Sequence, residues 1–177
     1  MSRPLFWRSV LLLGVLSDSH GDGVITARAI AMLEARGATR LIHCGDICGD
    51  AVLSEFAGHH IVFVWGNCDA PSAATRRLVK TLDLPWPDGR VELEIAGRRI
   101  AVFHGHEPEF ADAIHDGRFH YVFYGHTHRF RDERVNGCRI INPGALHRAA
   151  VKTVGLLNVE TDELIFLRVD NGEILAP

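Results

Sequence analysis

Side chains that commonly bind metal ions follow five short apolar segments of this sequence. Each segment has the pattern of a buried strand, and each ends in a short polar or glycine-containing loop. The loops are Asp18-Ser19-His20 after Leu16, Gly45-Asp46 after Ile42, Gly66-Asn67 after Val64, His104-Gly105-His106 after Phe103, and Gly125-His126-Thr127-His128 after Tyr124. Because ligand sites of an open α/β sheet lie outside the carboxyl ends of its strands, we expect these loops to converge.

Taken one at a time, most of these motifs carry little information. Asp-x-His, Gly-Asp and Gly-Asn are common turn sequences, in which the polar side chain often hydrogen-bonds to its own backbone. Gly125-His126-Thr127-His128 is more specific, because packing does not easily explain two histidines spaced i, i+2 after a buried strand. The shared position at strand ends is what favours a metal site over five separate turns.

The predicted ligands combine imidazole, carboxylate and amide groups and include no thiolate. This combination suits Mn²⁺, Fe²⁺, Zn²⁺ or Ni²⁺ rather than Cu⁺ or an iron–sulfur cluster. The predicted ligands are Asp18, His20, Asp46, Asn67, His104, His126 and His128. Seven ligands are too many for one tetrahedral zinc ion, but they match two cations about 3.5–4 Å apart that share a carboxylate. We therefore predict two divalent cations, with Mn²⁺ as the first choice.

The elements that must position these loops alternate between strand and helix in the first half of the chain. This alternation is typical of βαβ units that build a parallel or mixed sheet. We expect strands at residues 10–16, 40–43 and 61–65, and helices at 24–36, from Asp50 onward, and at 72–82. Gly37, directly after the first helix, is a good C-terminal cap.

In the second half, pairs of apolar segments flank short turns, as in β-hairpins. We expect three hairpins, which pair 91–95 with 99–103, 131–135 with 138–141, and 154–159 with 164–169. Between the first and the second hairpin we expect a helix at 107–116 and a strand at 120–124. Early helices and late hairpins predict an α/β fold with two stacked sheets and helices outside them. No linker divides the chain, so we expect a single domain, residues 1–177.

The predicted ligand series resembles that of the calcineurin-like metallophosphoesterases. The segments Gly-Asn-Cys-Asp, His-Gly-His and Asn-Pro-Gly are similar to those of the small bacterial and archaeal phosphodiesterase branch of this superfamily. The resemblance extends from Asp18 to Gly144. It implies a four-layer α/β/β/α sandwich of two mixed sheets flanked by helices, in agreement with the apolar pattern.

The resemblance also implies a role for each ligand. Asp18, His20 and His128 would bind the first metal ion, Asn67, His104 and His126 the second, and Asp46 would bridge both. A hydroxide that bridges the two cations would attack phosphorus in line, while the cations stabilise the charge on the phosphoryl oxygens. The residues nearest to catalysis would be Asp46, Asn67, His104 and His126.

One position departs from the phosphatase branches of the superfamily. There the asparagine is followed by a histidine that assists the leaving group, whereas this chain has Cys68. A thiol is a poor substitute for imidazole as a general acid near pH 7. We therefore expect phosphodiesters to be better substrates than phosphomonoesters with poor leaving groups. Asp69, the next residue, either orients a ligand or begins the following helix.

Several other residues near the predicted ligands are candidates for supporting roles. His106, Arg129 and His147 are candidates for contact with the substrate. Asn142-Pro143-Gly144 is similar to a turn that supports the site in the family, although an ordinary turn explains it equally well. The remaining histidines are expected in strands or on the surface: His43, His59, His60, His115 and His120.

Composition limits the class of protein. With 47% hydrophobic residues and a formal charge of −3, the chain resembles a folded globular protein and lacks the basic excess of proteins that bind long nucleic acids. No apolar stretch reaches the roughly 20 residues of a membrane span. Arg3, Arg8 and the apolar run at 10–16 resemble a secretory signal, but the run is short and leads into predicted ligands. The four cysteines lack paired spacing and are expected as reduced thiols in a cytoplasmic protein.

Three functions are compatible with these patterns. The leading hypothesis is a metal-dependent phosphodiesterase that hydrolyses a small phosphodiester. A non-catalytic scaffold on the same fold is the first alternative, although such scaffolds tend to lose ligands and this chain keeps the full set. A nuclease or nucleotide phosphohydrolase is the second alternative. The acidic balance argues against a long nucleic acid, whereas a dinucleotide or cyclic nucleotide would still fit.

Overall fold

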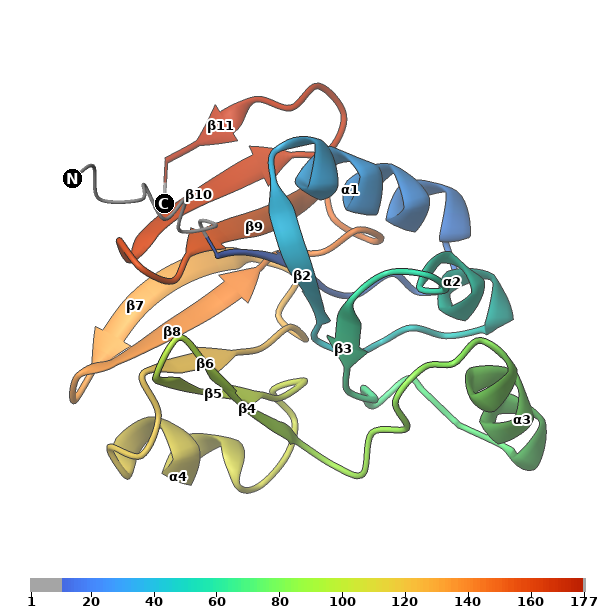
Figure 1. The fold of residues 1–177 in the computed structure, drawn as a ribbon, viewed down its shortest axis with the longest axis horizontal. Coiled ribbons are helices and arrows are strands. Elements are labelled where there is room, and N and C mark those ends of the chain that lie inside the picture. Colours follow the sequence, from blue (N-terminus) through green and yellow to red (C-terminus); the bar gives the residue numbers. More distant parts are fainter. Residues whose placement is uncertain (1–10, 177) are drawn as a thin grey trace, which may run out of the picture.

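The structure is a computed structural model that describes residues 11–176. Figure 1 shows how its helices and strands are arranged. In chain order they are β1 (Leu12–Leu16), α1 (Gly23–Ala35), β2 (Ala38–His43), α2 (Asp50–Glu55), β3 (Ile61–Phe63), α3 (Ala73–Thr81), β4 (Val91–Ile95), β5 (Arg98–Val102), α4 (Phe110–His115), β6 (Tyr121–Phe123), β7 (Phe130–Val135), β8 (Cys138–Pro143), β9 (Thr153–Asn158), β10 (Glu163–Arg168) and β11 (Ile174–Leu175).

The strands form two mixed sheets. The first has the order β11-β10-β9-β1-β2-β3, and the second has the order β4-β5-β6-β8-β7. In the first sheet, β1 is parallel to β2 and antiparallel to β9, while β2 is parallel to β3. In the second sheet, β6 is parallel to both of its neighbours, whereas β4 and β7 pair antiparallel at the edges. The predicted ligands follow β1, β2, β3, β5 and β6, each of which has a parallel neighbour.

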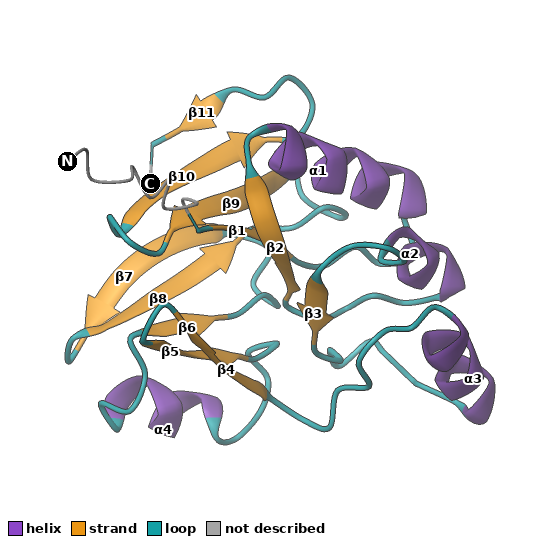
Figure 2. Ribbon diagram, viewed as in Figure 1, coloured by secondary structure: helices purple, strands orange, loops and turns teal. Residues whose placement is uncertain are grey.

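Three apolar clusters separate four layers. One cluster lies between the first sheet and α1, α2 and α3, and includes Leu33 and Phe56. The second lies between the two sheets and includes Val15 and Phe123, and the third packs α4 against the second sheet around Phe103. In Figure 2 the strands lie between α1, α2 and α3 on one side and α4 on the other. The predicted α/β/β/α sandwich is therefore confirmed.

Strand β1 is buried on both faces because it lies in the middle of the first sheet. Leu13 and Val15 point into the cluster between the sheets, and Leu16 belongs to the cluster under the helices. A Cβ at Gly14 would lie 2.8 Å from Leu33 Cδ1 and 2.7 Å from Leu41 Cδ2. Glycine at this position thus allows α1 to pack closely on the strand.

The predicted elements are present, with differences at several ends. β2 begins at Ala38 instead of residue 40, β3 ends at Phe63 instead of residue 65, and the hairpin between β4 and β5 turns on two residues, not three. The fourth helix starts only at Phe110, because the Glu107 carboxylate binds the loop before it. Strand β11 was not predicted, since two residues at a sheet edge leave no periodic pattern. Arg3, Arg8 and the predicted strand residue Val10 lie outside the described residues.

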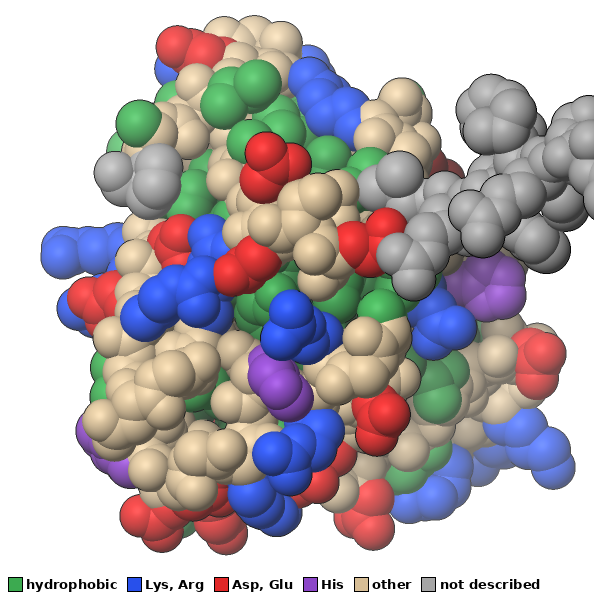
Figure 3. Space-filling view, turned by 60° about the vertical axis from the view of Figure 1, so that its left-hand side comes forward, with side chains coloured by type: hydrophobic (Ala, Val, Ile, Leu, Met, Phe, Trp, Pro, Cys, Tyr) green, Lys and Arg blue, Asp and Glu red, His purple; other side chains and the backbone are tan. Residues whose placement is uncertain are grey.

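The surface carries charged side chains of both signs (Figure 3). Figure 3 shows one face of the molecule, on which acidic and basic side chains are intermixed. Within residues 11–176, no helix has the length and apolar character to cross a membrane. The four cysteines are free thiols, and Cys44 and Cys138 are buried.

Candidate metal centre

The five predicted loops lie together at the carboxyl ends of β1, β2, β3, β5 and β6. Backbone hydrogen bonds continue beyond the strands: the Asp18 amide donates to the Gly45 carbonyl (3.0 Å), and the Gly125 amide donates to the His104 carbonyl (2.9 Å). The two sheets are joined here, because the His126 amide donates to Asp18 Oδ2 (3.1 Å). The seven predicted ligands are therefore brought to one place.

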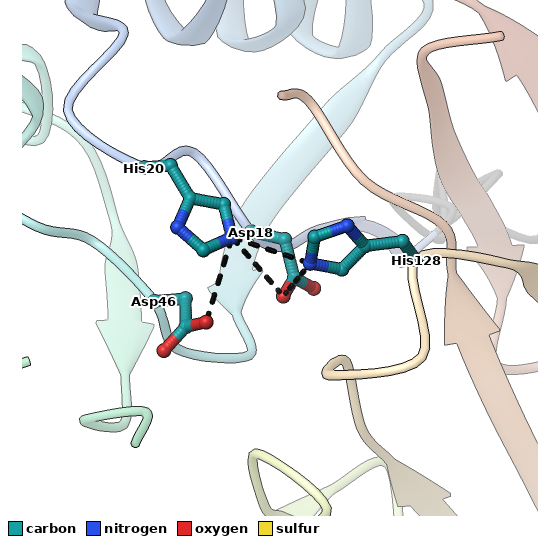
Figure 4. A group of neighbouring side chains, drawn as sticks. All are labelled: Asp18, His20, Asp46 and His128. Atoms are coloured by element: carbon teal, nitrogen blue, oxygen red, sulfur yellow. Dashed lines mark hydrogen bonds and ion pairs between the residues drawn. The ribbon is translucent and has the colours of Figure 1, made fainter. Parts of the chain in front are cut away.

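Four of the predicted ligands form the first group, which is drawn in Figure 4: Asp18, His20, Asp46 and His128. One ligand atom from each lies within 4.8 Å of all the others. The Nε2 atoms of His20 and His128 are 3.2 Å apart, and His128 Nε2 is 3.1 Å from Asp18 Oδ1. His20 Nε2 is 3.5 Å from Asp46 Oδ2. Ring nitrogens and carboxylate oxygens that converge in this way are suited to share a cation.

The second group combines the other three ligands with the same aspartate. Asn67 Oδ1 lies 3.0 Å from His104 Nε2 and 2.9 Å from His126 Nδ1. Asp46 Oδ1 lies 3.4 Å from His104 Nε2. Because the other oxygen of Asp46 belongs to the first group, this carboxylate lies between the two groups.

The burial of the carboxylates indicates that the groups fit divalent cations. Asp18 is fully buried, and its Oδ1 accepts no hydrogen bond from the described residues. Burial raises the pKa of this carboxyl, which means that its charged form lacks a sufficient partner within the protein. For Asp46 burial acts in the same direction, but hydrogen bonds from His104 and the Cys68 amide lower its pKa below the ordinary range. A cation would compensate the buried charge of Asp18.

A hydrogen bond to the backbone fixes the orientation of the His104 ring. Its Nδ1 lies 2.7 Å from the Cys44 carbonyl oxygen, which can only accept a hydrogen bond. In the neutral ring, the form that can bind a metal ion, the single proton is therefore on Nδ1, and the lone pair of Nε2 points toward Asn67 and Asp46. A second partner that fixes the tautomer of a histidine in this way is usual for metal ligands.

Comparison with known proteins places these features in a family. The model of the calcineurin-like phosphoesterase superfamily domain matches residues 11–162. The chain belongs to the calcineurin-like phosphoesterase superfamily. Members of this superfamily use divalent metal ions. The matched residues include both ligand groups.

Individual relatives include small archaeal and bacterial enzymes. A phosphodiesterase of Methanocaldococcus jannaschii is 29% identical over 157 residues, which cover 85% of this chain and 95% of that protein. The solved structure of an archaeal phosphodiesterase matches with a TM-score of 0.80 and 27% identity, over 93% of this chain and 100% of that one. The phosphoesterase YfcE of E. coli matches with a TM-score of 0.75 and 25% identity, over 94% and 97% of the two chains. These similarities confirm the resemblance seen in the sequence.

The ligands of this phosphoesterase have an unusual backbone. Five of the seven have a positive φ: Asp18 (55°), His20 (43°), Asp46 (55°), His126 (67°) and His128 (57°). This left-handed conformation is uncommon for residues with a Cβ, although aspartate and histidine adopt it more often than most. It lets the chain turn sharply at each strand end, so that consecutive ligands point into the same space.

Two glycines allow the loops to approach one another. A Cβ at Gly66 would collide with the side chain and backbone of Asp46, and a Cβ at Gly125 would collide with Ser17 Oγ and with the Asp18 side chain. The glycines of the Gly-Asn and Gly-His motifs are therefore required by packing against the ligands.

Three polar side chains hold the loops without joining the ligand groups. The Asp69 carboxylate accepts hydrogen bonds from the amides of Ile47, Cys48 and Gly66 and so connects two of the ligand loops. The N-terminal cap of α3 is Ser72, not Asp69. The Glu107 carboxylate accepts the amides of His104 and Gly105, both at 2.7 Å. Buried Asn142 donates to the Gly125 carbonyl oxygen (2.7 Å), which gives the Asn-Pro-Gly turn a supporting role.

His43 also connects the ligand loops, although the sequence analysis placed it only in a strand or on the surface. It does lie in a strand, but it is fully buried, and burial lowers its pKa to about 3. The Gly45 amide donates to its Nδ1 (3.2 Å), so the proton is on Nε2 and is donated to Ser19 Oγ (2.8 Å). Neutral His43 thus connects the loop of Asp46 to the loop of Asp18 and His20.

We expect His43→Asn to weaken Mn²⁺ binding by about 10–100-fold, the usual cost of losing a residue that orients metal ligands. The asparagine oxygen can accept the Gly45 amide but cannot reach Ser19. His43→Gln is the matched control, because its amide nitrogen can still reach Ser19, and it should bind Mn²⁺ more tightly than the Asn variant. Calorimetric titration measures both affinities, with circular dichroism as the check on folding. Wild-type affinity in the Asn variant would contradict the role.

The three candidate substrate residues lie around the ligand groups. The ring of exposed His106 is 5.4 Å from that of His104, and the ring of His147 is 6.2 Å from that of His20. Arg129 is exposed beside His128. Sequence reasoning missed Arg148, the residue after His147. Arg148 lines the same surface cavity as His128, a member of the first ligand group.

Proposed function

We propose that this protein is a two-metal phosphodiesterase that hydrolyses a small phosphodiester. The observation that carries the proposal is the position of Asp46 between two ligand groups, with Oδ2 3.5 Å from His20 Nε2 and Oδ1 3.4 Å from His104 Nε2. Membership of the phosphoesterase superfamily and the similarity to an archaeal phosphodiesterase support it.

The chain supplies the positions and charges that such a reaction needs. Asp18, His20 and His128 would hold one cation, Asn67, His104 and His126 the other, and Asp46 both. When bound, the cations lower the pKa of a coordinated water toward neutrality and neutralise charge on the phosphoryl oxygens. The ligands contribute only the two negative charges of Asp18 and Asp46. The site would therefore keep a net positive charge that attracts a phosphodiester anion.

The side chain after Asn67 favours a diester over a monoester. Cys68 is exposed beside the second ligand group, and its amide donates to Asp46 Oδ1 (2.9 Å). The ordinary pKa of a thiol is about 8.5, roughly two units above that of imidazole. The thiol is thus a weak proton donor for a poor leaving group.

This proposal predicts a substrate preference that a single substitution should change. With Mn²⁺ present, we expect faster hydrolysis of bis(4-nitrophenyl) phosphate than of 4-nitrophenyl phosphate, and little hydrolysis of phenyl phosphate. Cys68→His should raise the rate for phenyl phosphate by about 10²-fold, the lower end of the usual gain from general acid catalysis. Cys68→Ser is the control and should give no gain. A wild-type preference for the monoester would refute the argument from Cys68.

The alternatives find less support in the described residues. A non-catalytic scaffold would not need both ligand groups, which are complete here. A nuclease for long substrates would be expected to carry an excess of basic residues, whereas this chain has a formal charge of −3. A small diester is the substrate class that agrees with these features.

A further inference from the structure

A cavity of about 380 Å³ opens beside the candidate metal centre. We call it the arginine pocket, and its lining residues are Thr127, His128, Arg129, Phe130, Arg148, Ala149, Ala150 and Val151. They come from two segments, the connection from β6 to β7 with the first residue of β7, and the connection from β8 to β9. His128 is also a member of the first ligand group. A substrate with its phosphorus at the metal centre can therefore extend one arm into this cavity.

The charge of the arginine pocket is of one sign. Neither Arg129 nor Arg148 has a hydrogen bond or ion pair from its side chain to residues 11–176. No carboxylate lines this cavity, whereas four other cavities of the described surface each include at least one, such as Asp83, Glu107, Asp69 or Glu55. In a chain with a formal charge of −3, two guanidinium groups without an acidic partner at one cavity are suited to bind an anion.

The rest of the arginine pocket is apolar. Phe130 packs against Phe166, with ring centroids 5.0 Å apart, so its position is fixed by the core. Val151 is 38% exposed, one of three large hydrophobic side chains exposed among the described residues. Ala149 and Ala150 are small and leave room beside it. A ligand with a short carbon chain and a terminal anionic group would match both parts of this cavity.

We propose that the arginine pocket binds the non-reacting arm of the substrate, and that this arm ends in a phosphate group. Guanidinium groups bind phosphate through paired, charge-assisted hydrogen bonds. The inference rests on the proposed phosphodiesterase function and narrows its substrate class to diesters with a second phosphate.

The test compares two 4-nitrophenyl phosphodiesters with Mn²⁺-loaded protein. The first diester carries a 4-nitrophenyl group and a propyl group. The second carries a 4-nitrophenyl group and a propyl group with a phosphate on its third carbon. We expect a kcat/KM at least about tenfold higher for the phosphate-bearing diester, mostly through a lower KM. Arg148→Gln and Arg129→Gln should each reduce this ratio, and the double variant should bring it close to one. Arg77→Gln on α3, an exposed arginine outside the pocket, is the control and should keep the wild-type ratio.

Each other outcome overturns a defined part of the proposal. Equal kcat/KM values for the two diesters would exclude the phosphate-binding role and leave the phosphodiesterase function intact. A ratio that persists in the double variant would exclude the two arginines as its cause. If neither diester is hydrolysed, the phosphodiesterase function fails and this inference fails with it.

Discussion

Asp46→Asn is expected to lower kcat/KM for diester hydrolysis by about 10³-fold or more. An amide has only one oxygen, so it cannot offer a ligand to both groups, and it lacks the negative charge of the carboxylate. Lewis-acid stabilisation by a metal ion is worth several kcal/mol, and each 1.36 kcal/mol corresponds to a factor of ten in rate. Initial rates with bis(4-nitrophenyl) phosphate and Mn²⁺ measure the effect.

The fold of this variant should be intact, because asparagine tolerates the left-handed φ of 55° at position 46. Far-ultraviolet circular dichroism and thermal unfolding check this expectation. Asp83→Asn is a matched control, since Asp83 also has a positive φ (54°) but lies at the end of α3, outside both ligand groups. It should keep wild-type activity. Full activity of the Asp46 variant would contradict the proposed function.

Removal of metal with a chelator should abolish diester hydrolysis and lower the melting temperature, and Mn²⁺ should restore both. Without a cation, Asp18 Oδ1 stays buried without a hydrogen-bond donor among the described residues. A ligand present at 100 times its Kd stabilises the folded state by about 2.7 kcal/mol. For a chain of this size, that corresponds to roughly 5–10 °C in Tm.

The number of cations tests the two ligand groups separately. Calorimetry should find two Mn²⁺ ions per wild-type chain, and His126→Ala should weaken or remove one of them while the first group keeps its four members. The melting temperature provides a measurement that does not depend on turnover. An unchanged Tm and no hydrolysis with Mn²⁺, Ni²⁺, Fe²⁺ or Zn²⁺ would instead favour the scaffold function.

The ligand loops were predictable because two regular features coincide in the sequence. Apolar segments mark the buried strands, and the carboxyl ends of parallel strands meet at one edge of a sheet. Leu13 and Val15 show this regularity, since they alternate with residues that face the helices. The layers and the convergence of the loops follow from such local patterns.

The residues that support the ligand loops were not predictable in the same way. The bond from His43 to Ser19 joins residues 24 positions apart, and no local pattern specifies it. Glu107 was predicted to begin a helix, but its carboxylate is used by the His104 loop instead. Arg148 lies in the connection from β8 to β9, which links one sheet to the other. Such roles depend on tertiary contacts, which periodicity does not encode.

The positive φ angles of the ligands have a consequence for the evolution of this protein. Each strained residue costs roughly 1–3 kcal/mol, and replacement by glycine or asparagine would relieve part of that cost. A population selected only for heat tolerance should therefore accumulate substitutions at Asp18, His20, Asp46, His126 and His128. Stability and metal binding therefore make opposite demands at these five positions.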